Sequence, residues 1–175
     1  MDKKTIKKAF EAVDAKLDAA LNLLVGGGAA MLLGHGIPLS THDVDGLPLD
    51  SKISAAKFDV IAKEVAKDLG ISAQWYNDYF NSFTYTLPAD FRDRLKEVYR
   101  GKKLVVKVLG AEDLLIMKCM AGREKDIGHA RALIRRGANL QMVERHLEEL
   151  ARKGIVRAKD AVLFLEDLMM EIEDA

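Results

Sequence analysis

The stretch "NLLVGGGAAMLLGHGIPLSTHDVDG", residues 22–46, places an apolar run, three glycines, a helix-like segment and an Asp-Val-Asp motif in succession. Residues 21–25, "LNLLV", are apolar and end at a glycine, which is typical of a buried strand. Residues 28–34 return to a helical pattern that Pro38 ends, and residues 41–49 are predicted to form a second strand. This order predicts a strand, a turn and a helix that bring the chain back beside its first strand.

The glycines that follow the first strand, Gly26, Gly27 and Gly28, predict a turn at the start of a helix. Backbone N–H groups and the helix dipole favour an anion at such a point. Glycine also lets a phosphate approach the backbone closely. A phosphate-binding turn and a tight turn without a ligand both fit this pattern.

Asp43 and Asp45 are separated by one residue, so in a strand both side chains point to the same face. Two carboxylates about 7 Å apart on one face repel each other unless a cation lies between them. Magnesium is the usual solution, because it prefers oxygen and is often shared with substrate phosphates. An aspartate-rich strand end is the alternative, since Gly46 and Pro48 predict a turn directly after the motif. Together, the glycine turn and the two aspartates predict a triphosphate site at one edge of a small sheet.

Lys118 is the one polar residue of "LLIMKCMA", residues 114–121, a segment predicted to be a buried helix. A lysine is almost never fully buried without a partner. It either extends its charged end to the surface or pairs with a carboxylate or a phosphate. Asp126 lies eight residues further on and is a candidate partner, although it equally fits a helix cap.

Several basic residues and histidines lie near these motifs in the sequence. We predict that the helix after Asp126 has a solvated basic face, with contact to substrate as the alternative. His35 and His42 have no metal-ligand spacing to other His or Cys residues, so no zinc site is predicted. The residues of the basic face are His129, Arg131, Arg135 and Arg136.

The composition of the 175 residues fits one domain, or one core with a helical annex. With 27 basic and 27 acidic residues the net charge is zero, so any nucleic-acid contact would need a local patch. The candidates are Lys102, Lys103, Lys107 and the arginines of 131–136. The single cysteine, Cys119, excludes an internal disulfide. It fits a reducing compartment, and neither a secretory signal nor a membrane span is visible, so a cytoplasmic protein without a membrane partner is expected.

The rest of the chain adds one strand and several helices. Helices are predicted over 3–19 and over 54–69, where Gly70 is a helix stop, and a strand over 102–110. From Glu112 onward the pattern is helical, so an α+β domain with a C-terminal helical part is predicted. The helical part is divided near Gly122, Gly137 and Gly154.

These motifs resemble those of a known superfamily. "LVGGGAAMLLGHGIPLSTHDVD" resembles the signature of the DNA polymerase β nucleotidyltransferase superfamily. "EDLLIMKCMAGREKDIGHARAL" is similar to a second signature in a branch of minimal enzymes that contains the abortive-infection-type nucleotidyltransferase toxins. "QWYNDYF" resembles a Trp-x-Asn-Asp element of small, uncharacterised members of that branch. The resemblance covers roughly residues 20–135.

The resemblance implies a fold and a set of site residues. It implies a small mixed β-sheet core over residues 1–110 with helices on one side, and a helical part over 111–175 packed on that core as one compact unit. Gly26 and Gly27 match the phosphate-binding pair, with Gly28 in place of the small residue that follows. Asp43 and Asp45 match the metal-binding carboxylates, and Lys118 and Asp126 match the downstream pair of the active site.

Two departures from the pattern are visible in the sequence. Leu39 stands where many relatives have an arginine. The superfamily also places a third carboxylate on a later strand, and the best candidate strand, "LVVKV", carries Lys107 instead. The resemblance leaves Asp126 as the candidate for that carboxylate, which would assist the metal in activating the acceptor.

The resemblance implies transfer of a nucleoside monophosphate from an NTP, with Mg²⁺ or Mn²⁺, to a hydroxyl of RNA, protein or a small molecule. Lys118 would stabilise the phosphates, and Asp126 would orient Lys118 or accept the acceptor proton. The alternative is a non-catalytic nucleotidyltransferase-like module, such as an antitoxin or a regulatory subunit with a toxin–antitoxin partner. A third possibility is a homodimer through "AVLFLEDLMMEI", although its apolar stripe is more typical of a core.

Overall fold

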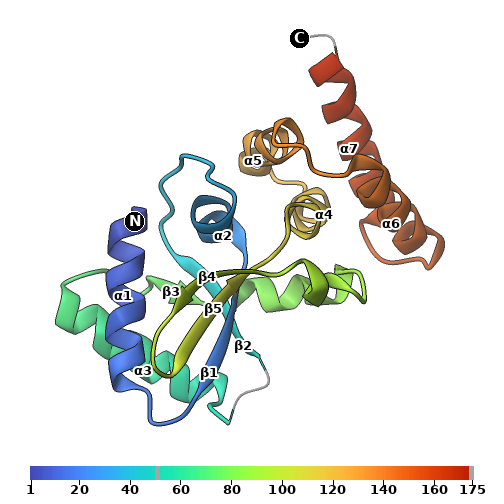
Figure 1. Ribbon diagram of the computed structural model, residues 1–175. Coiled ribbons are helices and arrows are strands. Elements are labelled where there is room, and N and C mark those ends of the chain that lie inside the picture. Colours follow the sequence, from blue (N-terminus) through green and yellow to red (C-terminus); the bar gives the residue numbers. More distant parts are fainter. Residues whose placement is uncertain (50–51, 174–175) are drawn as a thin grey trace. The chain divides into compact units, whose positions relative to one another are not determined.

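The computed structural model describes residues 1–49 and 52–173 and shows a mixed sheet with the strand order β3-β2-β1-β5-β4 (Figure 1). The central strand β1 runs parallel to β5 and antiparallel to β2. At the edges, β3 is parallel to β2, and β4 is antiparallel to β5. This architecture confirms the predicted α+β class. The strands are β1 (Leu21–Val25), β2 (Val44–Leu49), β3 (Tyr76–Asn77), β4 (Lys96–Arg100) and β5 (Leu104–Val108).

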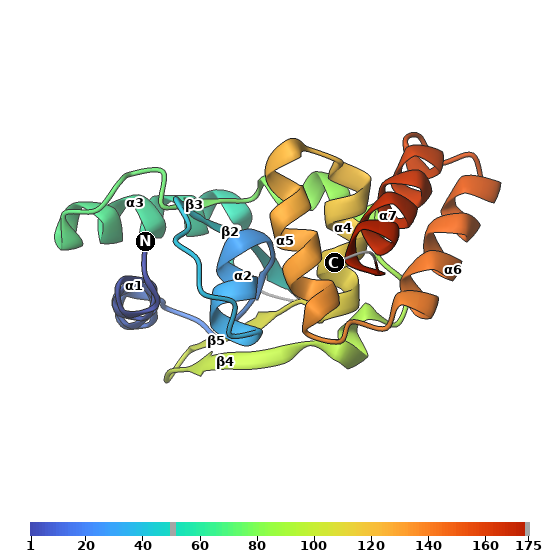
Figure 2. The same cartoon turned by 90° about the horizontal axis from the view of Figure 1, so that it is seen from above.

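Helices α1 (Lys3–Lys16), α2 (Gly27–Gly34) and α3 (Ala55–Leu69) pack on one face of the sheet, and α1 also packs against α3 (Figure 2). Phe58 of α3 makes an edge-to-face contact with Tyr76, with the ring centroids 4.6 Å apart. The register pairs Tyr76 with Val44, so Asp45, the next residue, faces the opposite side of the sheet.

The first and third helices begin at capping residues, and one of the two ends where the sequence predicts. Asp2 caps α1 by accepting a hydrogen bond from the Thr5 N–H at 2.7 Å. Ser54 caps α3, and Gly70 ends it in the left-handed conformation, with φ of +64°. The helix predicted over 54–69 is confirmed, whereas α1 ends at Lys16, three residues before the predicted end.

The prediction of a turn at Gly46 and Pro48 is wrong, because both residues lie inside β2. A Cβ on Gly46 would come within 2.6 Å of the Tyr76 ring, so glycine is needed there for packing inside a strand. β3 pairs with β2 only at Val44 and Asp45. Beyond these two residues β2 is an edge strand, where proline is tolerated.

The C-terminal helices begin and end close to the predicted glycines. Gly122, Gly137 and Gly154 all have positive φ, which ends one helix and separates it from the next. The predicted division of this part is confirmed, whereas β3 and β4 were not predicted. The helices are α4 (Ala111–Ala121), α5 (Glu124–Arg135), α6 (Leu140–Arg152) and α7 (Ala158–Glu173).

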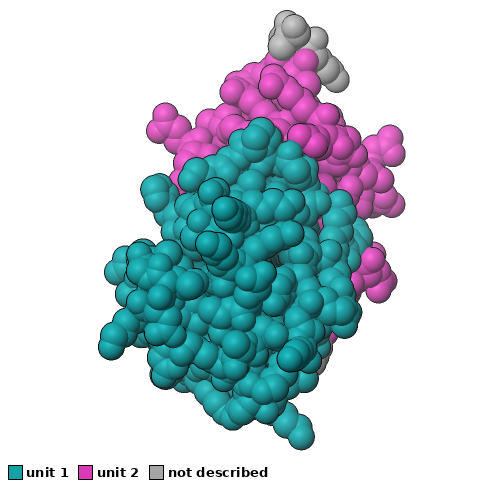
Figure 3. Space-filling view, turned by 60° about the vertical axis from the view of Figure 1, so that its left-hand side comes forward, with its two compact units in different colours: residues 1–82, 94–109 teal, residues 83–93, 110–175 magenta. Residues whose placement is uncertain are grey.

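The chain divides into two compact units (Figure 3). The first contains residues 1–82 and 94–109, and the second contains residues 83–93 and 110–175. The short 3₁₀ helices η1 (Tyr79–Thr86) and η2 (Phe91–Arg94) therefore both span a boundary between units. Packing of the helical part on the core stays a prediction. Among the described residues, none of the helices is both long enough and apolar enough to cross a membrane.

Candidate functional site

The glycine turn joins β1 to α2 as the sequence predicts. Gly26 is the N-cap of α2, and no side chain caps this helix. The N–H of Gly26 donates to the Asp45 carbonyl at 2.9 Å, which ties the turn to β2. The first N–H groups of a helix are not used by its own hydrogen-bond ladder, so this turn offers donors to an anion.

Gly27 brings the turn into direct contact with Asp45. Its φ is +59°, and a Cβ on it would lie 2.1 Å from Oδ2 of Asp45. Both facts require glycine, because a side chain would be strained and would collide with the carboxylate. The structure therefore places the start of α2 and an acidic side chain side by side.

Asp43 lies just before β2 and is half-buried. Its backbone carbonyl accepts a hydrogen bond from Thr41 Oγ1 at 2.8 Å. Its Oδ2 accepts one from Asn77 Nδ2 at 2.7 Å. Asn77 pairs with Asp45 in the parallel β2–β3 ladder, so all three side chains belong to the same end of the sheet.

On its side away from β1, β2 pairs with β3, whereas the "LVVKV" strand that was the candidate for a third carboxylate does not pair with β2. That strand is β5 and pairs with β1, with Lys107 opposite Leu24. The position next to Asp45 holds Asn77 instead. The signal for Asn77 was present in "QWYNDYF", but a strand of two residues has no periodicity that would reveal it.

The residues present fit a magnesium ion. Mg²⁺ is commonly bound through one or two carboxylates, with waters and substrate phosphates completing its ligands. Asp43 and Asp45 supply two carboxylates beside a turn suited to phosphate. Within the described residues, no group of three or more His, Cys, Asp or Glu side chains is arranged to hold a metal ion.

Lys118 is buried in the second unit, with 7% of its surface exposed, and is paired with a carboxylate. Its Nζ donates to Asp126 Oδ1 at 2.6 Å, and Arg123 Nε lies 2.6 Å from Oδ2 of the same residue. A carboxylate partner is therefore the interpretation that the structure supports. The N-cap residue of α5 is Arg123, and Asp126 lies in the first turn of this helix. A part for this pair in the nucleotide site stays a prediction.

Burial and charge act in opposite directions on Asp126. Burial alone would raise the pKa of its carboxyl, but hydrogen bonds from Arg123 and Lys118 outweigh burial and lower the pKa below its usual value. Asp126 is thus held as a carboxylate, and a carboxylate with a lowered pKa is a weak base.

His129 differs from the solvated residue that the sequence predicted. It is half-buried, and its Nδ1 is buried without a hydrogen-bond partner in the part of the chain that the structure describes. Burial, and then the charge of Lys118, lower the pKa of its imidazole. Arg131 of α5 pairs with Glu171, while Arg135 and the C-cap residue Arg136 are exposed as predicted.

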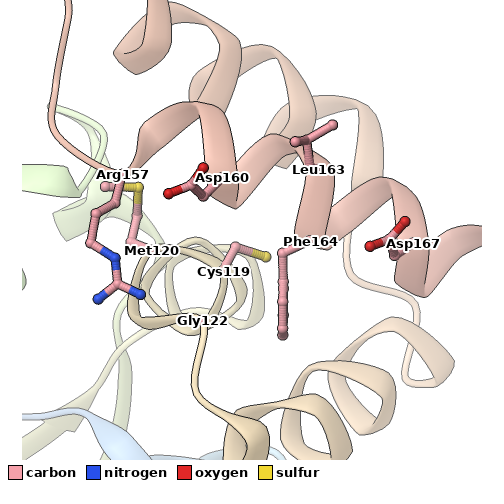
Figure 4. A pocket seen from close by; sticks show the side chains of 8 residues that line it. All are labelled: Cys119, Met120, Gly122, Arg157, Asp160, Leu163, Phe164 and Asp167. Carbon is pink, nitrogen blue, oxygen red and sulfur yellow. The ribbon is translucent and has the colours of Figure 1, made fainter.

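The second unit also contains a pocket of about 270 Å³ between the end of α4 and α7 (Figure 4). Arg157 Nη2 donates to the Ala121 carbonyl at 2.8 Å and so covers the last turn of α4. The Cys119 thiol is buried, and burial raises its pKa to about 12. The thiol therefore stays protonated at neutral pH and is not a ready nucleophile.

A mixed sheet with a glycine turn touching an Asp-x-Asp motif is the arrangement that the resemblance to nucleotidyltransferases implies. The chain belongs to a family described as a nucleotidyltransferase of unknown function (DUF6036), which matches residues 4–159. Comparisons with curated proteins and with solved structures gave no significant match. The abortive-infection branch stays a prediction.

Proposed function

We propose that this protein transfers a nucleoside monophosphate from an NTP to an acceptor hydroxyl, in a reaction that depends on magnesium. The observation that supports this most is the contact between Gly27 and Asp45, where a Cβ would lie 2.1 Å from the carboxylate. A backbone suited to phosphate and an acidic side chain suited to a cation then serve one triphosphate. The acceptor class, RNA, protein or small molecule, is left open by this proposal.

Each residue has a defined part in the proposal. The N–H groups at the start of α2, after Gly26 and Gly27, bind the β- and γ-phosphates. Asp43 and Asp45 hold Mg²⁺, which when bound neutralises charge on the phosphates. A part for Lys118 in binding the phosphates stays a prediction.

The proposed reaction forms one bond and breaks one. The acceptor oxygen attacks the α-phosphorus, the bond from that phosphorus to the bridging oxygen breaks, and pyrophosphate leaves with the bonding electrons. The acceptor proton passes to a base. Because its pKa is lowered, Asp126 suits the positioning of Lys118 better than it suits accepting this proton.

The proposal is tested with NTPs labelled at the α-phosphate, magnesium and a cell extract. Wild type is compared with Asp45→Asn and with the control Glu11→Gln, an exposed carboxylate on α1. We expect label in a macromolecule or a small acceptor with wild type and with the control, and at least about 100-fold less with Asp45→Asn. Equal labelling by Asp45→Asn, or none by wild type in the presence of acceptor, would contradict the proposal.

A second candidate is a non-catalytic module that binds nucleotide or a protein partner. The Lys118–Asp126 pair favours it, because at 2.6 Å the lysine charge is already neutralised inside the second unit. This candidate predicts magnesium-dependent NTP binding, or binding of a toxin–antitoxin partner, without any transfer of label.

A further inference from the structure

Asn77 is fixed in one orientation by two partners of opposite character. Its Nδ2 donates to Asp43 Oδ2 at 2.7 Å, and its Oδ1 accepts from the Tyr79 N–H at 2.9 Å. A carboxylate can only accept a hydrogen bond and a backbone N–H can only donate one. Reversing the amide would oppose like groups at both ends, so the NH₂ group must face Asp43 and the oxygen must face Tyr79.

The backbone that supports Asn77 is anchored on both sides. Trp75 Nε1 donates to the Ala62 carbonyl of α3 at 2.8 Å, and Tyr76 Oη donates to the Gly46 carbonyl of β2 at 2.9 Å. Both side chains are buried, with 0% and 7% of their surfaces exposed. Asn77 is therefore held by packed elements, although its own strand has only two residues.

Asp43, by contrast, is outside regular structure, one residue before β2 begins. The strand therefore does not set the direction of its side chain. Asn77 occupies Oδ2, whereas Oδ1 has no hydrogen-bond partner in the described part of the chain. The amide thus fixes the carboxylate with one oxygen left for a ligand.

We propose that Asn77 is a positioning residue that locks the Asp43 carboxylate for a divalent cation, and that its own amide oxygen is not a ligand of that cation. This inference rests on the proposed function, because it concerns the cation that Asp43 and Asp45 would hold. Groups that orient metal ligands commonly change metal affinity by about 10–100-fold when removed. We expect removal of the Asn77 amide to weaken cation binding by a factor within this range.

The test measures Mn²⁺ binding to the full chain by electron paramagnetic resonance, with and without an ATP analogue that has a methylene group between the α- and β-phosphates. We expect Asn77→Ala to bind Mn²⁺ about 10–100-fold more weakly than wild type. Binding of the analogue without metal should not change, because it depends on the glycine turn. A merely structural role of Asn77 would instead weaken the binding of Mn²⁺ and of the analogue together.

Two further variants keep the test decisive. Asn77→Ser retains an acceptor for the Tyr79 N–H but is too short to reach Asp43. It should therefore show the same weakened Mn²⁺ binding, and it replaces Asn77→Ala in the test if the alanine variant folds poorly. Asp78→Asn removes the exposed neighbouring carboxylate and should leave Mn²⁺ affinity unchanged.

Three results would overturn the inference. The first is unchanged Mn²⁺ affinity in Asn77→Ala and Asn77→Ser, and the second is an equal loss of analogue and Mn²⁺ binding. The third is a loss in Asp78→Asn, which would make that carboxylate the relevant group. Wild type that binds no Mn²⁺ under either condition would overturn the proposed function as well, and so is distinct from the other results.

Discussion

At the level of single residues, the candidate site depends on the absence of a side chain at Gly27. This residue combines a φ of +59° with a carboxylate oxygen 2.1 Å from its would-be Cβ. Gly70 has a similar φ of +64° but nothing within 4 Å of its would-be Cβ. The two glycines therefore separate the cost of backbone strain from the cost of disturbing Asp45.

We expect Gly70→Ala to lower the free energy of unfolding by about 1–2 kcal/mol, the usual cost of a left-handed non-glycine residue. Gly27→Ala should cost more, because Asp45 or the backbone must also move. It should also weaken binding of Mn²⁺ and NTP, which Gly70→Ala should not. Chemical denaturation and binding titrations measure both effects. Equal behaviour of the two variants would show that Asp45 is not held against the turn.

The Lys118–Asp126–Arg123 cluster predicts an asymmetry between two substitutions. Asp126→Asn leaves the buried Lys118 ammonium without its carboxylate, which should cost about 3–5 kcal/mol of unfolding free energy. Lys118→Met should cost less, because Arg123 Nε remains 2.6 Å from Asp126. Denaturation of both variants in one buffer measures the difference. A larger loss in Lys118→Met would show that Arg123 does not compensate.

His129 predicts a pH dependence of stability. The pKa of its imidazole is lowered in the folded protein, so the unfolded chain binds this proton more tightly. This contribution to stability should therefore fall as the pH drops through about 6.5, the ordinary histidine pKa. The loss of unfolding free energy from pH 7 to pH 5 should therefore be smaller in His129→Gln than in wild type. An equal dependence of the unfolding free energy on pH in wild type and in His129→Gln would refute this role of His129.

At the level of elements, the sequence predicts the helices and strands whose apolar residues form a regular pattern or that end at a strong stop signal. The apolar run of β1, the amphipathic α3 and the left-handed glycines between the C-terminal helices all have such signals. β3 has two residues, and β4 alternates poorly and is mostly exposed, so neither has a local pattern. Asn77 was missed for the same reason: only the pairing of β3 with β2 brings it to Asp43.

Because β3 is short, its position should depend on Trp75. Trp75→Phe removes the hydrogen bond to Ala62 and leaves space in the core, at a cost of about 1–3 kcal/mol. It should also weaken Mn²⁺ binding, because Asn77 follows two residues later. Tyr85→Phe, at a residue that is 60% exposed, should change neither quantity. Normal Mn²⁺ binding by a destabilised Trp75→Phe would show that β3 keeps its place without this anchor.

At the level of the whole chain, the division into two units does not follow the sequence order. Residues 83–93 belong to the second unit although β4 and β5, which follow them, belong to the first. His146 Nε2 and the Thr86 carbonyl lie 2.8 Å apart, which ties this segment to α6. The sequence predicts a boundary at residue 110 and contains no signal for the earlier segment, because the contact joins residues 60 positions apart.

Native-state hydrogen exchange should therefore group residues 83–93 with the C-terminal helices. We expect amides of this segment to open with those of α6, since cooperative units follow packing rather than sequence order. His146→Ala should speed hydrogen exchange in residues 83–93 and in α6, and it should leave the exchange rates of β1 and β5 unchanged. Exchange of residues 83–93 together with the strands would refute the division.

The decisive measurement compares NTPs labelled at the α-phosphate with NTPs labelled at the γ-phosphate, using the purified chain, magnesium and an extract that supplies acceptor. Nucleotidyl transfer predicts that the α-label enters the acceptor, that the γ-label leaves as pyrophosphate, and that Asp45→Asn abolishes both. Transfer of the γ-label to the acceptor, or α-label transfer that survives Asp45→Asn, would contradict it.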